Sequence, residues 1–473
     1  MLSVFRIYDN KIIIVKEKYI FYNVYYKRTN VHIRETKGVE NVAKPIAVGL
    51  LGLGTVGSGV VKIIENHQDQ LIHQVGCPVV VKKILVRDVY KERDVQVNTS
   101  LLTTRADEVI NDPEIDVIIE VMGGIEETRR HLLQALQQGK HVVTANKDLM
   151  ALYGSELLAT ATENGCDLFY EASVAGGIPI LRSLVEGLAS DRITKMMGIV
   201  NGTTNFILTK MCKYGMPYEQ VLAEAQDLGY AEADPSADVE GLDAARKMAI
   251  LARLGFSMNI DLEDVQVKGI TDITEEDLDY SKRLGYTMKL IGIAHRDGDK
   301  AEVSVQPTLL PDSHPLASVS DEYNAVYVYG EAVGETMFYG PGAGSLPTAT
   351  AVVSDLVAVM KNMRLGVNGR SAVAPQYEKR LKSRSEIFSK YFVRIHVKDE
   401  VGAFAKITAI FAEQGVSFEK ILQLPLKEKG LAEIVIVTHR ASQQAYEDIL
   451  QRLRDLEIVH QVKSSYRVEG NGN

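Results

Sequence analysis

Ile46-Ala-Val-Gly-Leu-Leu51-Gly52-Leu-Gly54-Thr55-Val56-Gly57 is the stretch that decides the fold of this chain. Its first part is short and apolar, which predicts a buried strand, and the spacing Gly-x-Gly-x-x-Gly predicts a tight turn into a helix. Glycine lets the backbone turn and approach a pyrophosphate, and the free N–H groups at a helix start attract the charge of that group. We therefore expect a dinucleotide site formed by Gly52, Gly54, Thr55, Val56 and Gly57.

Further strands are predicted after this turn, separated by helical segments: Val79 to Val86, Val117 to Val121 and His141 to Thr144. Strands that alternate with helices in this way form a parallel, doubly wound sheet of the Rossmann type, the architecture of an α/β protein. The sequence therefore predicts a nucleotide-binding domain at residues 45–175, completed by an Ala/Val-rich helix within about 340–370.

The end of the second predicted strand bears on which nicotinamide cofactor binds. An acidic residue at this point binds the ribose hydroxyls of NAD, whereas an arginine accommodates the 2′-phosphate of NADP. Here Arg87 and Asp88 stand side by side. Arg87 favours NADP, Asp88 favours NAD, and use of both stays open; the alternative for Arg87 is a solvated loop charge.

The composition is that of an ordinary globular protein: 473 residues, 46% hydrophobic and 24% charged. The length suggests two to four domains. The net charge of -9 is spread along the chain without a basic face, so we expect no nucleic-acid partner. No run of about 18 apolar residues predicts a membrane span. Three widely spaced cysteines, without metal-ligand spacing, predict reduced thiols in a cytoplasmic protein: Cys77, Cys166 and Cys212.

The rest of the chain divides into segments of different character. Residues 176–339 mix strand-like runs with helices and predict an α+β domain. Residues 371–390 are polar and predict a linker, so the core should fold without the C-terminal residues beyond it. Residues 391–468 read βαββαβ, the ferredoxin-like arrangement. Residues 1–44 differ in composition and predict a disordered extension outside the folded core, with a docking arm as the alternative.

An acidic, glycine-containing loop opens into a helix between Ala225 and Lys247. Asp243 and Lys247 are spaced i,i+4 on that helix, so both side chains lie on one face. Carboxylates followed by a helix-mounted lysine suit a small substrate with an ammonium group and a proton to move. The alternative for the pair is an exposed salt bridge worth only about 0.3–0.5 kcal/mol. Lys147, directly after a buried strand, joins the candidates because ligands bind at the carboxyl ends of such strands.

Several motifs resemble those of homoserine dehydrogenases and follow the same order: Thr144-Ala-Asn-Lys147, Glu171-Ala-Ser-Val174-Ala-Gly-Gly177-Ile-Pro179, Gly198-Ile-Val-Asn-Gly202-Thr203-Thr204-Asn205 and the run 225–247. The turn Gly340-Pro-Gly342-Ala-Gly344 fits as well, so the resemblance covers nearly the whole chain after residue 45. It implies an NAD(P)-dependent enzyme that interconverts L-homoserine and L-aspartate 4-semialdehyde in threonine, methionine and isoleucine biosynthesis. It also makes 176–339 the catalytic and dimerisation domain.

The resemblance implies roles for individual residues. The catalytic residues would be Lys247, Lys147 and Asp243, with Lys247 donating the proton when the carbonyl accepts hydride. Lys147 would lower the pKa of Lys247 and Asp243 would raise it, and the sequence leaves the balance open. The substrate would contact Glu232, Asp243, Asp238, Gly202, Thr203 and Tyr230. The cofactor would also contact Lys147, Gly229 and Gly344.

A structural monovalent cation, Na⁺ or K⁺, is implied at Glu171, Val174, Gly176 and Ile178, because glycines permit a backbone that aims several carbonyl oxygens inward. A glycine-rich hinge without metal is the alternative.

The C-terminal module resembles an ACT domain. This implies an amino-acid effector, threonine by the logic of the family, near Asp399 and Gly402, and a homodimer or homotetramer. A module used only for dimerisation is the alternative. Two rival functions also stay open: another amino-acid dehydrogenase on the same scaffold, and a non-catalytic sensor of nucleotide and amino acid.

Overall fold

The computed structural model describes residues 4–8, 11–16, 19–27, 30–33, 44–370, 375–426 and 430–470, the first four segments as backbone only. The chain forms two compact units. The first comprises Met1–Ala145, Glu156–Tyr170 and Val352–Ala372, and the second comprises Asn146–Ser155, Glu171–Ala351 and Val373–Asn473. Among the helices of the described residues, none is long and apolar enough to cross a bilayer.

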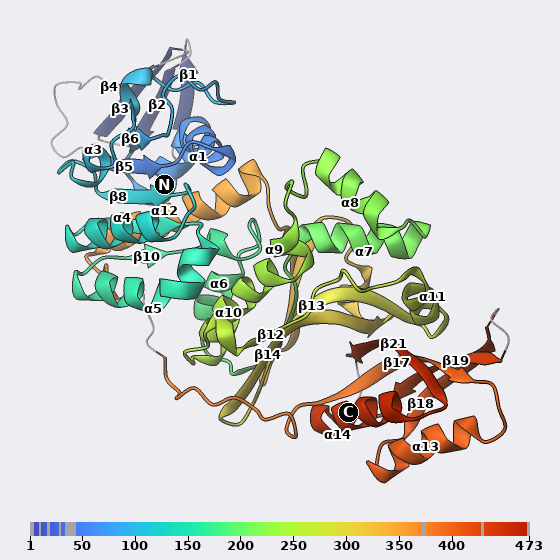
Figure 1. Ribbon diagram of the computed structural model, residues 1–473. Coiled ribbons are helices and arrows are strands. Elements are labelled where there is room, and N and C mark those ends of the chain that lie inside the picture. Colours follow the sequence, from blue (N-terminus) through green and yellow to red (C-terminus); the bar gives the residue numbers. More distant parts are fainter. Residues whose placement is uncertain are drawn as a thin grey trace. The chain divides into compact units, whose positions relative to one another are not determined.

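A six-stranded parallel sheet is the framework of the first unit (Figure 1). Its strands, in spatial order, are β10 (Leu168–Phe169), β9 (His141–Thr144), β8 (Val117–Glu120), β5 (Ile46–Leu51), β6 (Val79–Leu85) and β7 (Leu102–Thr103). Every residue of β5, β8 and β9 is buried, as expected of strands covered on both faces. The strand order reverses between β5 and β8, the place where such sheets bind ligands. The predicted Rossmann-like domain is confirmed.

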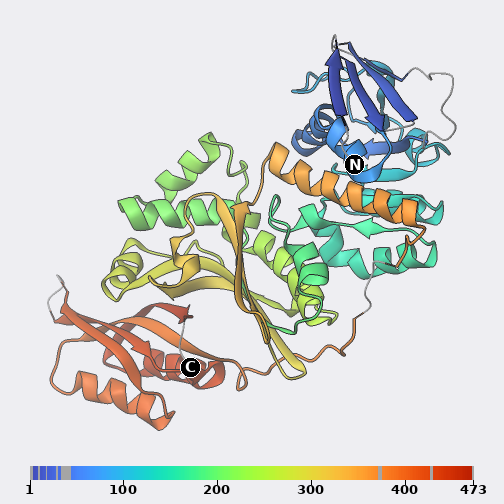
Figure 2. The ribbon, with the colours of Figure 1, turned by 180° about the vertical axis from the view of Figure 1, so that it is seen from behind.

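The helices of this unit are α1 (Thr55–Asn66), α2 (Gln68–Val75), α3 (Asp107–Ile110), α4 (Glu126–Gln137), most of α12 (Ser345–Leu365) and the second half of α5 (Lys147–Glu163). Figure 2 shows the orange helix α12 beside the blue and teal elements of the first unit, which lie much earlier in the sequence. Asn362 on α12 donates to the buried Asp167 carboxylate at 2.8 Å. This late helix therefore belongs to the nucleotide unit.

Four antiparallel strands form a separate sheet near the N-terminus: β1 (Val4–Tyr8), β2 (Lys11–Lys16), β3 (Tyr19–Lys27) and β4 (Asn30–Ile33). The sequence predicts a disordered extension here, but the residues of these four strands form a sheet. The physical reason is the content of valine, isoleucine and tyrosine, which favour strands. The other residues of 1–43 lie outside the described residues.

The second unit is built on an eleven-stranded sheet. The part formed by residues 193–341 contains β16 (Gly334–Pro341), β15 (Tyr323–Gly330), β11 (Ile193–Ile199), β13 (Tyr286–Asp297) and β14 (Lys300–Pro311) in that order, with β12 (Val265–Val267) beside β14. The helices are α6 (Ile180–Arg182), α7 (Gly202–Tyr214), α8 (Tyr218–Asp227), α9 (Ser236–Val239), α10 (Leu242–Phe256) and α11 (Glu275–Arg283). Helix α10 packs tightly on the sheet, because a Cβ on Gly292 would lie 2.3 Å from Met248.

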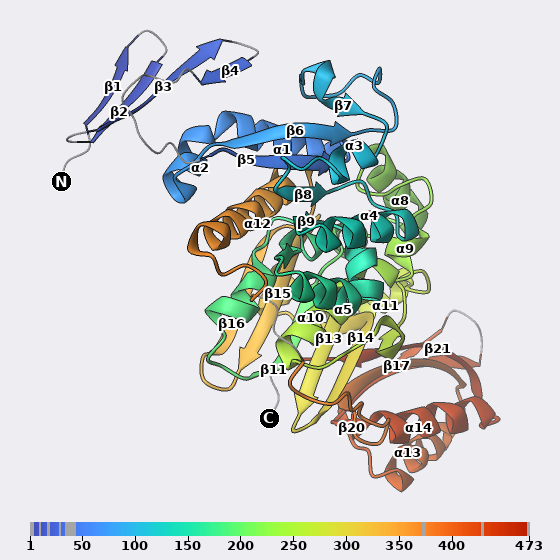
Figure 3. The same cartoon turned by 90° about the vertical axis from the view of Figure 1, so that its left-hand side faces the viewer.

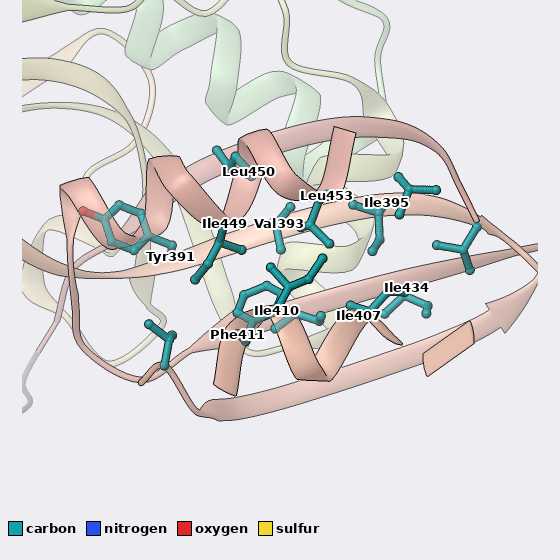
Figure 4. Close-up of a cluster of buried hydrophobic side chains, with 14 of the residues drawn as sticks. Tyr391, Val393, Ile395, Ile407, Ile410, Phe411, Ile434, Ile449, Leu450 and Leu453 are labelled. Atoms are coloured by element: carbon teal, nitrogen blue, oxygen red, sulfur yellow. The ribbon is translucent and has the colours of Figure 1, made fainter. Parts of the chain in front are cut away.

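The C-terminal module has the predicted βαββαβ order, with one short extra strand. Its elements are β17 (Phe388–Lys398), α13 (Ala403–Glu413), β18 (Phe418–Pro425), β19 (Leu431–Thr438), β20 (Ala441–Ser442), α14 (Gln443–Asp455) and β21 (Val459–Val468). Both helices cover the same face of the module's sheet (Figure 3). An apolar cluster that includes Ile407, Phe411, Ile434 and Ile449 fills the space between the layers (Figure 4).

This module continues the sheet formed by residues 193–341. Strand β21 pairs in parallel with β14, where Thr308 lies opposite Arg467 and Leu309 opposite Val468. Ion pairs also join the module to this sheet: Arg467 of β21 binds Glu302 of β14 at 3.1 Å and Glu469 at 2.7 Å, and Lys195 of β11 binds Glu469 at 2.6 Å. The predicted linker also contacts β14, because the Ala301 N–H donates to the Arg380 backbone oxygen at 2.8 Å. The polar linker predicts a module that is separate from the core, whereas in the structure the two share one sheet. Residues 371–374 lie outside the described residues.

Candidate active site

The three glycines of the turn before α1 lie in different surroundings. Gly52 has a φ of 106°, and a Cβ there would lie 2.9 Å from the Met122 backbone. A Cβ on Gly57 would lie 2.2 Å from the Gly52 oxygen. A Cβ on Gly54, in contrast, would meet no atom within 4 Å. Packing explains the first and third glycines, whereas the second leaves room for a group that approaches from outside.

The start of α1 suits an anion. Gly54 is the N-cap and supplies no side-chain acceptor, and the first turn, which includes Thr55 and Val56, carries no acidic residue. The N–H groups at a helix start have no partner within the helix, and they carry the positive end of its dipole. The residues present therefore fit the pyrophosphate of a dinucleotide.

Glu120, at the last position of β8, supports the same edge of the sheet. It is fully buried, and its Oε1 accepts the N–H groups of Met122 at 2.8 Å and Gly123 at 3.0 Å. The Thr144 hydroxyl donates to its other oxygen at 2.5 Å. Sequence analysis missed this residue, although a carboxylate that ends a buried apolar strand was an available signal.

Arg87 and Asp88 follow β6 and are both exposed. The Asp88 Oδ1 accepts the Tyr90 N–H at 2.8 Å, so this carboxylate stabilises the turn. The Arg87 guanidinium is exposed beside it at the end of the strand.

Asp243 lies between two lysines in the second unit. Gly241, with a φ of 84°, precedes α10, and Asp243 and Lys247 lie on successive turns of that helix. The Asp243 Oδ2 is 2.7 Å from the Lys247 Nζ, and its Oδ1 is 3.1 Å from the Nζ of Lys147, the first residue of α5. The Lys247 Nζ also donates to the Val200 oxygen at 2.7 Å. The Asp243 side chain is 9% exposed and that of Lys247 is 12%, so the pair is no surface salt bridge.

The electrostatics hold Asp243 and Lys147 in their charged forms. Burial raises the pKa of Asp243, but Lys247 and Lys147 lower it more, and the pKa lies well below its usual range. Burial lowers the pKa of Lys147, but Asp243 and Asp148 raise it more, and it lies above its usual range. Asp243 and Lys147 are therefore ionised at neutral pH. The arrangement presents cationic N–H donors to a polar oxygen of a substrate.

Asn201 ties this cluster to the acidic loop. Its Oδ1 accepts the Thr204 N–H at 2.9 Å and thereby caps α7. Its Nδ2 lies 2.7 Å from the Asp238 Oδ1 and 2.9 Å from the Asp243 Oδ2. Burial raises the pKa of Asp238, and the Asn201 hydrogen bond opposes this. Sequence analysis missed Asn201, although asparagine before a helix is a typical N-cap.

The predicted substrate residues fall into two groups. The Thr203 hydroxyl lies 2.7 Å from the Tyr230 oxygen and 3.0 Å from the Asp238 Oδ2, so it belongs to the cluster. Gly202 begins α7 beside it, and a Cβ there would lie 2.7 Å from the Glu322 oxygen. Gly229, with a φ of 76°, turns the chain before Tyr230. Glu232 is exposed farther along the loop, where its backbone oxygen accepts from Gln226 at 3.1 Å.

The predicted cation segment has a sharply turned backbone. Ala175 and Gly176 have φ values of 53° and 48°, and a Cβ on Gly176 would lie 2.3 Å from the Gly342 oxygen. Val174 and Ile178 are buried on either side of this turn. The Glu171 carboxylate accepts the Leu181 N–H at 2.8 Å and the Arg182 N–H at 2.7 Å, so it caps α6. Burial raises the pKa of Glu171, and these N–H groups oppose this.

Side-chain ligands do not account for a metal here. Within the described part of the chain, no group of three or more His, Cys, Asp and Glu residues could hold an ion. The donors that fit a hard cation at this turn are backbone carbonyl oxygens.

Two other predicted residues lie at helix starts. Gly344 has a φ of 117° and directly precedes α12. Gly402, with a φ of 88°, is the N-cap of α13 and supplies no side-chain acceptor. Asp399 is exposed just before it, and its N–H donates to the Gly430 oxygen at 2.9 Å.

Known proteins match this chain along most of its length. The model of the homoserine dehydrogenase NAD-binding domain matches residues 52–171, and that of homoserine dehydrogenase itself matches 179–357. A homoserine dehydrogenase of Bacillus subtilis is 74% identical over 430 residues, 91% of this chain and 99% of the relative. The chain belongs to the homoserine dehydrogenase family. The ACT domain model matches residues 391–458, so the C-terminal module is an ACT domain.

Solved homoserine dehydrogenases have the same architecture. The crystal structure of the enzyme from Thiobacillus denitrificans is 39% identical with a TM-score of 0.85, over 91% of this chain and 99% of that one. A hyperthermophilic archaeal homoserine dehydrogenase in complex with NADPH is 26% identical with a TM-score of 0.56, over 67% of this chain and 98% of that one.

Proposed function

We propose that this chain catalyses the NAD(P)-dependent interconversion of L-homoserine and L-aspartate 4-semialdehyde, a step toward threonine, methionine and isoleucine. The observation that carries this proposal is the buried Asp243 carboxylate paired with both Lys147 and Lys247. The high identity to a homoserine dehydrogenase over nearly the whole relative supports it.

The cluster suits proton transfer to a carbonyl oxygen. The nicotinamide, when bound, supplies the hydride that reduces the aldehyde carbon. Lys247 donates the proton that the oxygen then needs, and Asp243 and the Val200 oxygen orient its amine for this step. Lys147 places a second positive charge in the cluster, which stabilises the negative charge that develops on the oxygen.

NADP is the cofactor that we propose, with use of NAD left open. Arg87 is exposed at the strand end and can pair with a 2′-phosphate, whereas Asp88 already accepts a backbone N–H. We also propose a structural Na⁺ or K⁺ on the carbonyl oxygens of Val174, Gly176 and Ile178 and of the Glu171 region.

Regulation and assembly complete the proposal. Threonine would bind the ACT domain near Asp399 and Gly402, and two or four copies would assemble. The buried free thiols of Cys77 and Cys166 fit the reducing cytoplasm.

The deciding experiment is a nicotinamide absorbance assay with homoserine. Turnover by the wild-type chain excludes the non-catalytic sensor, and comparison with other amino alcohols excludes another dehydrogenase. Lys247→Ala should lower the rate by about 10²-fold or more, since that is the range of general acid catalysis. NADP binding, measured by fluorescence titration, should stay unchanged.

Lys282→Ala is the matched control, because Lys282 is an exposed lysine near the end of another helix of the same unit. A rate loss of less than about tenfold in Lys247→Ala would contradict the assigned role.

A further inference from the structure

Lys289 is a buried amine that the proposed chemistry does not use. It lies on β13 and is 2% exposed. Its Nζ donates to the Asn205 Oδ1 at 2.9 Å, the Val319 oxygen at 2.6 Å and the Thr209 Oγ1 at 3.4 Å. These acceptors are neutral, and burial lowers the pKa of Lys289 to about 8. Because a methionine would fill similar space without the cost of burying an amine, packing alone does not explain a lysine here.

The Lys289 amine joins α7 to the segment 319–323, which we name the 319–323 loop. Asn205 and Thr209 lie on α7. The Asn205 Nδ2 donates to the Val319 oxygen at 3.3 Å and the Tyr323 oxygen at 3.1 Å, so it holds both ends of the loop. In the middle, the Asp321 N–H donates to the Thr209 Oγ1 at 3.1 Å.

The 319–323 loop carries backbone strain. Asp321 has a φ of 58°, the left-handed region that is unfavourable for residues with a Cβ. Such conformations persist where the surroundings hold them, and they occur often at functional sites. Hydrogen bonds from α7 and β13 provide that restraint here.

The residue after the strained position, Glu322, lies beside residues of the proposed substrate site. Burial and the nearby Glu322 carboxylate raise the pKa of Tyr230. The Tyr230 ring meets Phe206 of α7 edge-on, with centroids 5.1 Å apart, and the Tyr230 backbone carbonyl oxygen accepts the Thr203 hydroxyl at 2.7 Å. Gly202 lies against the Glu322 backbone. One wall of the site is therefore built from the elements that Lys289 joins.

We propose that Lys289 is a positioning residue that, through Asn205 and the 319–323 loop, sets Glu322 against Tyr230 and so shapes the substrate pocket. The inference rests on the proposed function. Lys289 is absent from the Lys147–Asp243–Lys247 cluster, so its loss should weaken substrate binding much more than it slows proton transfer. In kinetic terms, the KM for homoserine rises while kcat changes little.

The first test compares Lys289→Met with Lys140→Met. Lys140 is a matched control, a buried lysine of the other unit whose amine donates to the Asp112 oxygen at 2.5 Å and the Ile115 oxygen at 2.7 Å. Lys289→Met should raise the KM for homoserine by about tenfold, with less than about a threefold change in kcat or in the KM for NADP. Lys140→Met should leave the KM for homoserine unchanged even if its Tm falls. Equal homoserine KM values for Lys289→Met and the wild type, or a parallel loss in all constants that tracks the fall in Tm, would overturn the proposal.

The second test does not depend on the folding of a core variant. Glu322→Ala and Tyr230→Phe each remove the same Glu322–Tyr230 interaction, so the double variant should be no worse than either single one, whereas Glu322→Gln should restore part of the affinity. Additive effects on the homoserine KM, or no effect of Glu322→Ala, would overturn the proposal. If the wild-type chain does not oxidise homoserine at all, the proposed function fails before these comparisons begin.

Discussion

Arg394→Met should strongly destabilise the unit that contains the catalytic and ACT domains. Arg394 lies on β17, and its Nε and Nη1 are 2.8 Å from Asp277 of the catalytic domain and 2.9 Å from Glu433 of the ACT domain. The exposed fractions of these side chains are 3%, 0% and 4%. Methionine fills similar space but leaves two carboxylates buried without their cation. Breaking such a buried pair costs about 3–5 kcal/mol.

The measurement is thermal unfolding by calorimetry. At about 2–4 °C per kcal/mol for a unit of this size, Arg394→Met should lower the Tm by about 6–20 °C. Arg384→Met is the control, since Arg384 pairs with Glu447 at 2.8 Å but is 64% exposed, and such a pair is worth no more than about 1 kcal/mol. If the two variants lose similar stability, the buried pair does not hold the domains together. Deletion from residue 380 onward would then leave a stable core, which we do not expect.

Three further outcomes are expected. Asn201→Ala removes the donor shared by the buried Asp243 and the half-buried Asp238, so kcat/KM for homoserine should fall about 10- to 100-fold at unchanged cofactor KM, and a smaller fall would leave Asn201 as a helix cap only. Arg87→Ala should raise the KM for NADP much more than that for NAD; equal rises would show that Arg87 does not bind the 2′-phosphate. Burial raises the pKa of Glu469, but its cationic partners lower it more, from 4.5 to about 2. The folded state therefore binds fewer protons, and the stabilisation is complete above pH 4.5 and lost as the pH falls toward 2. Urea unfolding of Glu469→Gln should show a weaker pH dependence over this range, and identical pH profiles would contradict the assigned pairing.

Patterns within short stretches of sequence predict much of this fold. The buried strand and glycine turn at 46–57 contain their signal within twelve consecutive residues, and the structure has the predicted strand, turn and helix there. The βαββαβ order of the ACT domain is readable for the same reason, because strand and helix periodicities repeat over a few residues. The Asp243–Lys247 pair is equally local, since i,i+4 spacing places both side chains on one helix face.

Contacts between distant segments were not readable in this way. Lys147 reaches Asp243 only because α5 and α10 are brought together, and Asn201 binds both aspartates only because α7 begins beside the acidic loop. The polar composition of residues 371–390 predicts a free linker, but the pairing of β21 with β14 makes the ACT domain part of the catalytic sheet.

By itself, then, the sequence determined the Rossmann-type and ferredoxin-like elements, the family and most of the candidate residues, because backbone preferences and motifs are encoded in short stretches. Tertiary structure alone decided which charges are buried. Arg394 and Arg384 carry the same side chain ten residues apart, yet one is enclosed between carboxylates and the other is in solvent. The energy of a charge depends on the water removed around it and on the partners placed beside it, and both are set by segments that meet only in the folded chain.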